Sequence, residues 1–255
     1  MSSKQTKHKP TPDSYRERTY RGQVGTEGLV SCEVILRETD LQILAPVDVA
    51  ATALDLVRHY RNQLENYIAR NPEFQTAMSP LPLDRLAPAI VQEMYRAADA
   101  AGVGPMAAVA GVIAEFVGLG LLERHNLSEI VVENGGDIYL QRQQVATVAI
   151  FAGASPLSNK VGIRLRAEQT PIGICTSSAT VGHSISLGRA DAVTVLSAST
   201  ALADAVATRI GNETKQDRDI NQALALAATI SGIRGVLIIK GKKMGVWGDL
   251  ELVGL

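Results

Sequence analysis

The sequence predicts an α+β fold, in which helices pack on a mixed or antiparallel sheet. Strand-like segments are grouped together, as are helical ones, without the regular alternation of a Rossmann-type domain. The 255 residues are 46% hydrophobic and 20% charged, with a formal net charge of -1, which excludes a disordered acidic segment or a basic polyanion binder. With only 3 Phe, 1 Trp and 6 Tyr, the core must be mainly aliphatic, and base stacking is not expected.

The chain begins with a basic segment. Residues 1–21 carry six Lys or Arg and two acidic residues, so they sum to about +4 and the rest to about -5. Without interleaved aromatic residues, this predicts a flexible basic tail rather than a nucleic-acid-binding arm. We expect one domain over 22–255, with two intertwined subdomains as the alternative. The segment contains no apolar stretch typical of a signal sequence, which predicts a cytoplasmic protein.

A hairpin and a long helix are expected first. Alternating residues over 29–37 and 41–45 predict two strands joined by a turn. Apolar residues spaced by three and four predict an amphipathic helix over 48–70, ending before Asn71 and Pro72. A proline-rich loop then leads to two alanine-rich helices, which suit either an intramolecular core or a homo-oligomer interface. These helices are expected over 88–101, closed by Gly102, and over 105–124.

Within the second of these helices, the apolar run 109–122 is too short to span a bilayer and contains Glu115. We therefore expect a buried core helix and no membrane association. Short extended segments follow, which predict the sheet. They cover 129–133, 138–142, 145–151, 161–166, 172–176 and 192–196. The remaining elements are expected to be helices over 199–210 and 220–230 and a closing hairpin over 235–253.

The two cysteines, Cys32 and Cys175, lie far apart and form no CxxC motif. We expect both to be reduced, behaving as small buried hydrophobic side chains.

Three segments could carry chemistry, and the first is the E-N-G-G-D segment over 133–137. Two glycines between two strands can adopt positive φ and present backbone amides to a phosphate or carbonyl oxygen. The alternative is an ordinary hairpin turn, for which Asn-Gly is the commonest sequence.

The second segment, 176–184, holds five hydroxyl side chains and one histidine in nine residues. Such a loop can cradle phosphate, although its hydroxyls could equally cap local backbone groups. His183 could act as a general base, but no orienting acid lies beside it in the sequence. The other residues of interest here are Thr176, Ser177, Ser178, Thr180, Gly182 and Ser184.

The third segment places Asp204 and Thr208 four residues apart on a predicted helix, so that their oxygens share one face. Mg²⁺ takes one or two protein oxygens and leaves the rest to water and phosphate, so this pair suffices for a metal site. The alternative is an aspartate that bonds a neighbouring loop.

Together, N-x-G-G-D, T-S-S and A-D-A-x-A-T resemble the ApbE-like superfamily of FAD-dependent protein flavin transferases, over residues 104–210. The chain is most similar to its short, uncharacterised cytosolic branch. The resemblance implies that FAD or FMN binds at the turn and the serine loop, and that a metal is held on the helix. The residues that the resemblance places at the flavin nucleotide are Asn134, Gly135, Gly136, Asp137, Thr176, Ser177 and Ser178, and those it makes Mg²⁺ ligands are Asp204 and Thr208. We further expect Thr180, Gly182 and Ser184 to bind the flavin nucleotide, and His183 and Ser177 to be the catalytic residues.

The sequence also departs from the transferases. It lacks their Lys-Gly pair near 104–111 and their H-x-x-D-P-x-T-G segment, and it has Ala179 in place of a glycine. We therefore expect a protein that binds a flavin nucleotide or a related phosphate-bearing small molecule, with Mg²⁺-dependent FMN transfer or FAD hydrolysis as the enzymatic form. The alternative is a non-catalytic module for ligand binding or for docking a redox protein.

Overall fold

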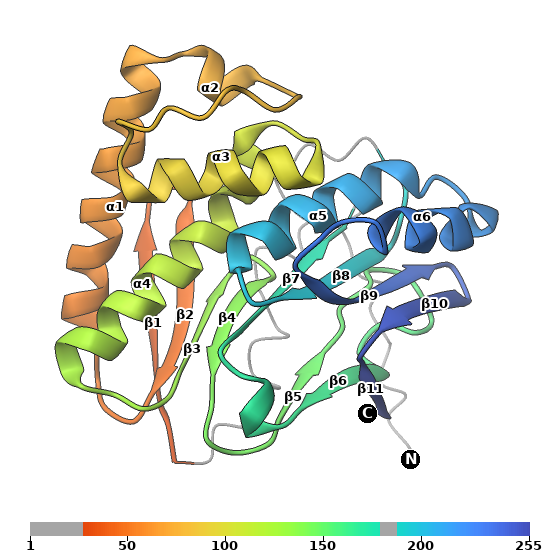
Figure 1. Cartoon of the computed structure of the whole chain (residues 1–255). Coiled ribbons are helices and arrows are strands. Elements are labelled where there is room, and N and C mark those ends of the chain that lie inside the picture. Colours follow the sequence, from red (N-terminus) through yellow and green to blue (C-terminus); the bar gives the residue numbers. More distant parts are fainter. Residues whose placement is uncertain (1–27, 179–187) are drawn as a thin grey trace, which may run out of the picture.

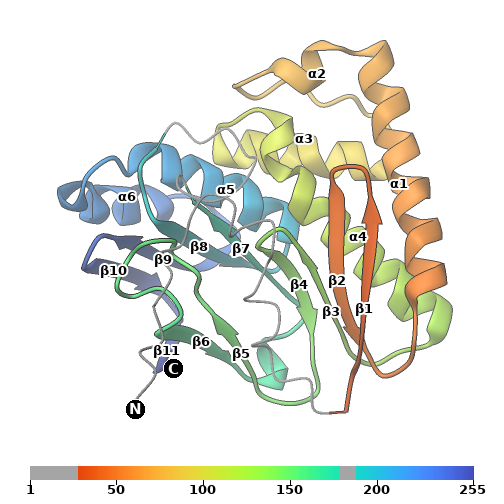
Figure 2. The same ribbon diagram turned by 180° about the vertical axis from the view of Figure 1, so that it is seen from behind.

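The computed structural model describes residues 28–178 and 188–255 and shows an α+β protein, as predicted. A large sheet is covered on one face by helices and on part of the other face by a smaller sheet (Figures 1 and 2). The large sheet has eight strands in the order β1-β2-β3-β4-β7-β8-β9-β10, and the small one has the order β11-β6-β5. All neighbouring strands in both sheets are antiparallel.

Most predicted strands are present within a residue or two of their expected ends. The strands of the large sheet are β1 (Val30–Leu36), β2 (Thr39–Ala45), β3 (Ile130–Asn134), β4 (Asp137–Gln141), β7 (Ile172–Ser177), β8 (Ala192–Ser197), β9 (Ile233–Lys240) and β10 (Lys243–Gly248). The small sheet is formed by β5 (Ala146–Ala149), β6 (Val161–Leu165) and β11 (Glu251–Gly254).

The helical layer buries an aliphatic core against the large sheet. The alanine-rich helices contribute Ala97, Ala101, Ala108 and Ala114 to it, which shows that these alanines serve the intramolecular core. The helices are α1 (Ala50–Arg70), α2 (Glu73–Thr76), α3 (Ala89–Ala101), α4 (Val109–His125), α5 (Thr200–Glu213) and α6 (Ile220–Ala227), with single 3₁₀ turns at Pro105–Ala108, Ala167–Gln169 and Asp217–Asp219.

Helix α4 lies at the centre of this layer. By length and composition, the segment Pro105–His125 could cross a membrane, with a mean hydropathy of 1.9 in its most apolar window. Half of that window is buried inside the protein, and α4 packs on β3 and β4 and against α1, α3 and α5. Its apolar composition is therefore that of a core helix, as the sequence predicted.

The prediction of one closing hairpin over 235–253 is wrong in its second half. Strands β9 and β10 form the hairpin, but the chain then turns at Gly248 and β11 pairs with β6 in the small sheet. Gly248 has φ +91°, and a Cβ there would lie 2.3 Å from the carbonyl oxygen of Arg234. This close approach requires glycine and lets the chain leave the large sheet.

A second apolar core lies between the two sheets. Residues alternate between the two cores along each strand, because successive side chains of a strand point to opposite faces. On β3, for example, Val132 belongs to the core under the helices and Val131 to the core between the sheets. Cys32 and Cys175 are both free thiols, as predicted, although only Cys175 is fully buried.

Candidate functional site

The E-N-G-G-D segment forms the turn of the β3–β4 hairpin, with Asn134 and Asp137 paired across it. Gly135 and Gly136 have φ +68° and +108°, which are the positive values that a tight two-residue hairpin requires. The amide of Gly136 donates to Glu133 Oε1 at 2.7 Å. The hairpin interpretation of this segment is therefore confirmed.

Two polar side chains of the hairpin project toward the helical layer. Asn134 donates from Nδ2 to the carbonyl oxygen of Ala110, at the start of α4, over 3.0 Å. Asp137 is the register partner of Cys175 on β7, and its carboxyl group lies beside the Cys175 thiol. Both Asn134 and Asp137 are buried, so the first segment presents an amide and a carboxyl group to the beginning of α4.

The side chain of Asp204, on α5, also lies at the start of α4. Its Oδ2 accepts the amide of Gly111 at 2.9 Å, and the amide of Ala110 also donates to this carboxylate. These amides belong to the first turn of α4, where backbone N–H groups have no partner inside their own helix. Asp204 thus caps a helix that is distant in the sequence.

A second carboxylate makes the reciprocal contact. Glu115 of α4 accepts the amides of Thr200 and Ala201, in the first turn of α5, at 2.8 and 3.3 Å. The two helices therefore run antiparallel where they meet, and each supplies a carboxylate to the N-terminus of the other. Their close approach depends on Gly111, because a Cβ there would lie 2.6 Å from the Thr200 carbonyl oxygen.

The carboxyl groups of Asp137 and Asp204 form an electrostatically strained pair. Burial raises the pKa of Asp137 well above its ordinary value, and the neighbouring Asp204 raises it further. Burial also raises the pKa of Asp204 to about 7, although the amides of Gly111 and Ala110 oppose this shift. Neither buried carboxylate has a cationic partner among these interactions, so ionisation of both is unfavourable unless a cation is bound.

These residues fit a Mg²⁺ ion in chemical terms. Mg²⁺ is commonly held by one or two carboxylates, with water and ligand oxygens completing its coordination. Asp204 and Thr208 are one helical turn apart on α5, and Asp137 adds a carboxyl group beside Asp204. In the described part of the chain, no cluster of three or more His, Cys, Asp or Glu residues forms a metal site. A Mg²⁺ site here would therefore combine at most two carboxylates with the Thr208 hydroxyl.

Only part of the serine-rich segment 176–184 lies on the same face of the sheet as Asp137 and Asp204. The Thr176 hydroxyl lies 2.9 Å from that of Thr194, its register partner on β8. Because the neighbouring Cys175 and Val195 face the helices, strand alternation directs the Thr176 side chain to the opposite face of the sheet. The Thr176 hydroxyl therefore lies on the other face of the sheet from Asp204, whereas the Thr176 amide donates to the Gly136 carbonyl at 3.1 Å.

Ser177 lies on the side of α5. A Cβ placed at Gly211 would be 3.5 Å from Ser177 Oγ, so this hydroxyl packs against the second half of the helix that carries Asp204. Ser178 ends the described part of the loop and is engaged in an interaction of its own. The remaining predicted residues, Thr180, Gly182, His183 and Ser184, lie outside the described residues, and their roles stay predictions.

Sequence reasoning missed the contributions of Cys175 and Glu115. Cys175 was expected to be merely a small buried residue, yet its thiol lies between Asp137 and the carbonyl oxygen of Thr200, to which it donates at 3.3 Å. Glu115 was noted only as a charge within an apolar run. A lone charge in such a run is a signal for a buried partner, because an unpaired charge is costly in a core.

Comparison with known proteins agrees with the fold and with the family resemblance. A family model described as AbpE bacteria matches residues 22–240. The chain belongs to this family. A UPF0280 protein of Methanocaldococcus jannaschii is 42% identical over 229 residues, which cover 86% of this chain and 91% of that protein. Another UPF0280 protein, from Methanosarcina acetivorans, is 38% identical over 221 residues and 86% of both chains.

Solved structures share the fold at low sequence identity. A variant of the flavin transferase ApbE from Vibrio cholerae matches with a TM-score of 0.54 and 15% identity, over 86% of this chain and 96% of that chain. The apo flavinyl transferase ApbE of Pseudomonas stutzeri matches with a TM-score of 0.53 and 12% identity, over 86% and 93%. This chain therefore has the fold of the ApbE flavin transferases.

Proposed function

We propose that the protein binds a flavin nucleotide, FAD or FMN, or a related phosphate-bearing small molecule, together with Mg²⁺, where the β3–β4 turn meets α4 and α5. The observation that carries the proposal is the pair of buried carboxyl groups, Asp137 and Asp204, whose pKa values are both raised. Two buried negative charges at one place favour a divalent cation, and a cation held there attracts phosphate.

The remaining residues supply the ligand contacts. Thr208 would add a hydroxyl to the Mg²⁺ site, and Mg²⁺ would neutralise phosphate charge in this buried setting. The turn at Gly135 and Gly136 allows a ligand to approach the backbone closely, because neither residue has a side chain. Ser177 would donate its hydroxyl to a phosphate oxygen from the side of α5. His183, which lies outside the described residues, is the proposed acid or base.

Thermal unfolding in the presence of ligand tests the binding proposal. A ligand that binds only the folded state raises its stability, so FAD with Mg²⁺ should raise the melting temperature more than either alone. Asp204→Asn should lose this joint effect. Asp55→Asn is the matched control, because it makes the same chemical change on the exposed surface of α1. Failure of FAD and Mg²⁺ to stabilise the unmodified protein would contradict the proposal.

Turnover separates an enzyme from a binding module. Hydrolysis of FAD would consume water, break the pyrophosphate bond and release FMN and AMP, and chromatography resolves all three nucleotides. We expect Mg²⁺-dependent release of FMN and AMP, or transfer of FMN from FAD to a protein acceptor with release of AMP, and loss of either activity in His183→Ala and Ser177→Ala. Binding without any turnover would instead favour a non-catalytic module that docks a redox protein.

A further inference from the structure

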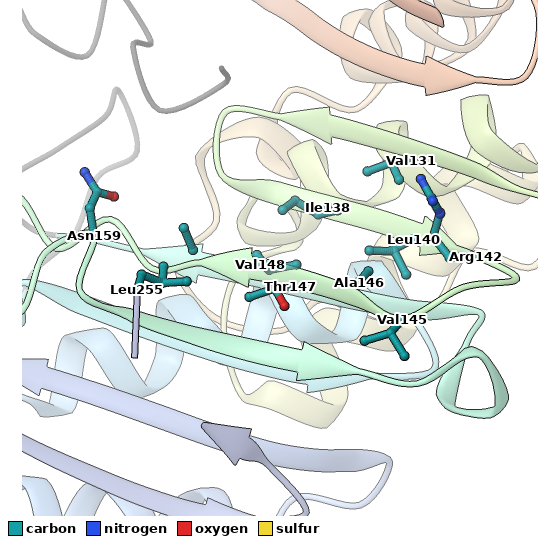
Figure 3. A pocket seen from close by; sticks show the side chains of 11 residues that line it. Val131, Ile138, Leu140, Arg142, Val145, Ala146, Thr147, Val148, Asn159 and Leu255 are labelled. Atoms are coloured by element: carbon teal, nitrogen blue, oxygen red, sulfur yellow. The ribbon is translucent and has the colours of Figure 1, made fainter. Parts of the chain in front are cut away.

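A separate cavity lies on the opposite face of the large sheet from Asp137 and Asp204. It has a volume of about 400 Å³ and lies between β3 and β4 of the large sheet and β5 of the small one (Figure 3). The strand alternation fixes this separation, because Val131 and Leu140 line the cavity whereas Val132 and Tyr139 face the helices. What binds in this cavity is therefore independent of the proposed flavin site.

The cavity wall is mainly aliphatic. Val131, Leu140 and Val148 are buried lining residues that belong to the core between the sheets. Val145 and Leu255 also line the cavity, and they are 59% and 58% exposed. A cavity of this volume suits a small molecule. Because Val145 and Leu255 are exposed, the cavity opens to solvent beside them.

One buried cation lies at the end of this apolar wall. Arg142 is 8% exposed and follows β4, and Figure 3 shows its side chain directed back over the sheet toward Val131. Its Nε is 3.1 Å from Glu129 Oε2, yet this nitrogen makes no hydrogen bond within the described part of the chain. The ion pair with Glu129 leaves this buried donor without a well-aligned hydrogen bond, so a ligand acceptor with better geometry would be stabilised here.

A second orphaned polar atom is found at the other end of the lining. Asn159 Oδ1 is buried and has no hydrogen-bond partner among the described residues. Figure 3 shows Asn159 and Arg142 at opposite ends of the view, with aliphatic side chains between them. The cavity therefore offers a donor at one end, an apolar middle and an acceptor at the other.

We propose that this cavity is a binding site for a small carboxylic acid with an aliphatic body, whose carboxylate bonds to Arg142. The arginine fork matches a carboxylate in shape and charge. The aliphatic body replaces water against Val131, Leu140 and Val148, and a hydroxyl at its far end would bond Asn159. Glu129 is a competing anion beside Arg142, so it limits the affinity for the ligand.

Titration calorimetry of the full chain with octanoate tests the proposal, with 1-octanol as the neutral analogue. We expect saturable binding of octanoate and at least about tenfold weaker binding of octanol, since a hydrogen bond between charged groups contributes 1.4 kcal/mol or more. Arg142→Met should weaken octanoate binding to the same extent. Arg58→Met, on the exposed surface of α1, is the matched control and should bind normally.

Two further variants distinguish an effect on octanoate binding from an effect on folding. Glu129→Gln removes the competing charge and should tighten octanoate binding, which no folding defect would do. Ala146→Phe fills the space beside β5 and should abolish binding while the response to FAD and Mg²⁺ remains. The proposal is overturned if octanoate shows no saturable binding, if octanol binds equally well, or if Glu129→Gln binds octanoate more weakly than the unmodified protein.

Discussion

The substitution Asp204→Asn should make the metal-free protein more stable at alkaline pH. Asparagine keeps an oxygen acceptor for the amide of Gly111 but removes a charge that burial disfavours. The pKa of Asp204 is raised to about 7 in the folded protein from an ordinary value of 3.8. Since one pKa unit corresponds to about 1.4 kcal/mol, ionising this group costs at most about 4 kcal/mol of folding free energy above pH 7.

The sign of the pH dependence follows from the direction of the shift. Between pH 4 and pH 7 the unfolded chain loses the Asp204 proton while the folded protein keeps it, so the free energy of unfolding falls as pH rises through this range. Above pH 7 both states are ionised at this residue, and its contribution no longer changes. The raised pKa of Asp137 acts in the same direction.

Urea denaturation in EDTA at pH 5, 6, 7 and 8 measures this effect. We expect the unfolding free energy of the unmodified protein to decrease toward pH 8, and that of Asp204→Asn to decrease less. Added Mg²⁺ should restore the stability of the unmodified protein at pH 8 but should not change that of Asp204→Asn. The reasoning would be refuted if Asp204→Asn were less stable than the unmodified protein at pH 8, or if both proteins showed the same pH profile.

Other substitutions test the packing and the two faces of the sheet. Gly111→Ala should destabilise the protein by about 1–3 kcal/mol in urea denaturation, because the added Cβ overlaps the Thr200 carbonyl oxygen. In urea denaturation, the unfolding free energy of Glu115→Gln should fall less between pH 5 and pH 8 than that of the unmodified protein, because burial raises the pKa of Glu115 although it accepts two first-turn amides of α5. Thr176→Val should leave stabilisation by FAD unchanged, whereas Ser177→Ala should reduce it, because only Ser177 packs toward α5. An equal loss of FAD stabilisation in both variants would contradict this assignment of faces.

Local sequence signals were sufficient for most of the elements and for one part of the site. Asn134 and the two glycines predicted a turn between strands, and the backbone there has the positive φ values that glycine permits. Gly102 predicted the end of α3, where it adopts φ +70°. These features depend on residues close together in the chain, so their chemistry could be read from the sequence.

Contacts between distant residues could not be predicted in this way. Asp204 and Gly111 are 93 positions apart, and their hydrogen bond exists only because α4 and α5 pack antiparallel. The departure of β11 to the small sheet likewise depends on the close approach at Gly248. Residue spacing in the sequence does not predict these contacts, because they depend on how whole helices and strands pack against each other.

The sequence by itself determined the α+β class, the hairpin turn and the three segments that carry polar side chains. Only the tertiary structure decided how those segments meet: Asp137 and Asp204 share a buried site at the start of α4, whereas the Thr176 hydroxyl lies on the other face of the sheet. The physical reason is that strand register and helix packing set which side chains face each other, and both depend on contacts between segments far apart in the chain.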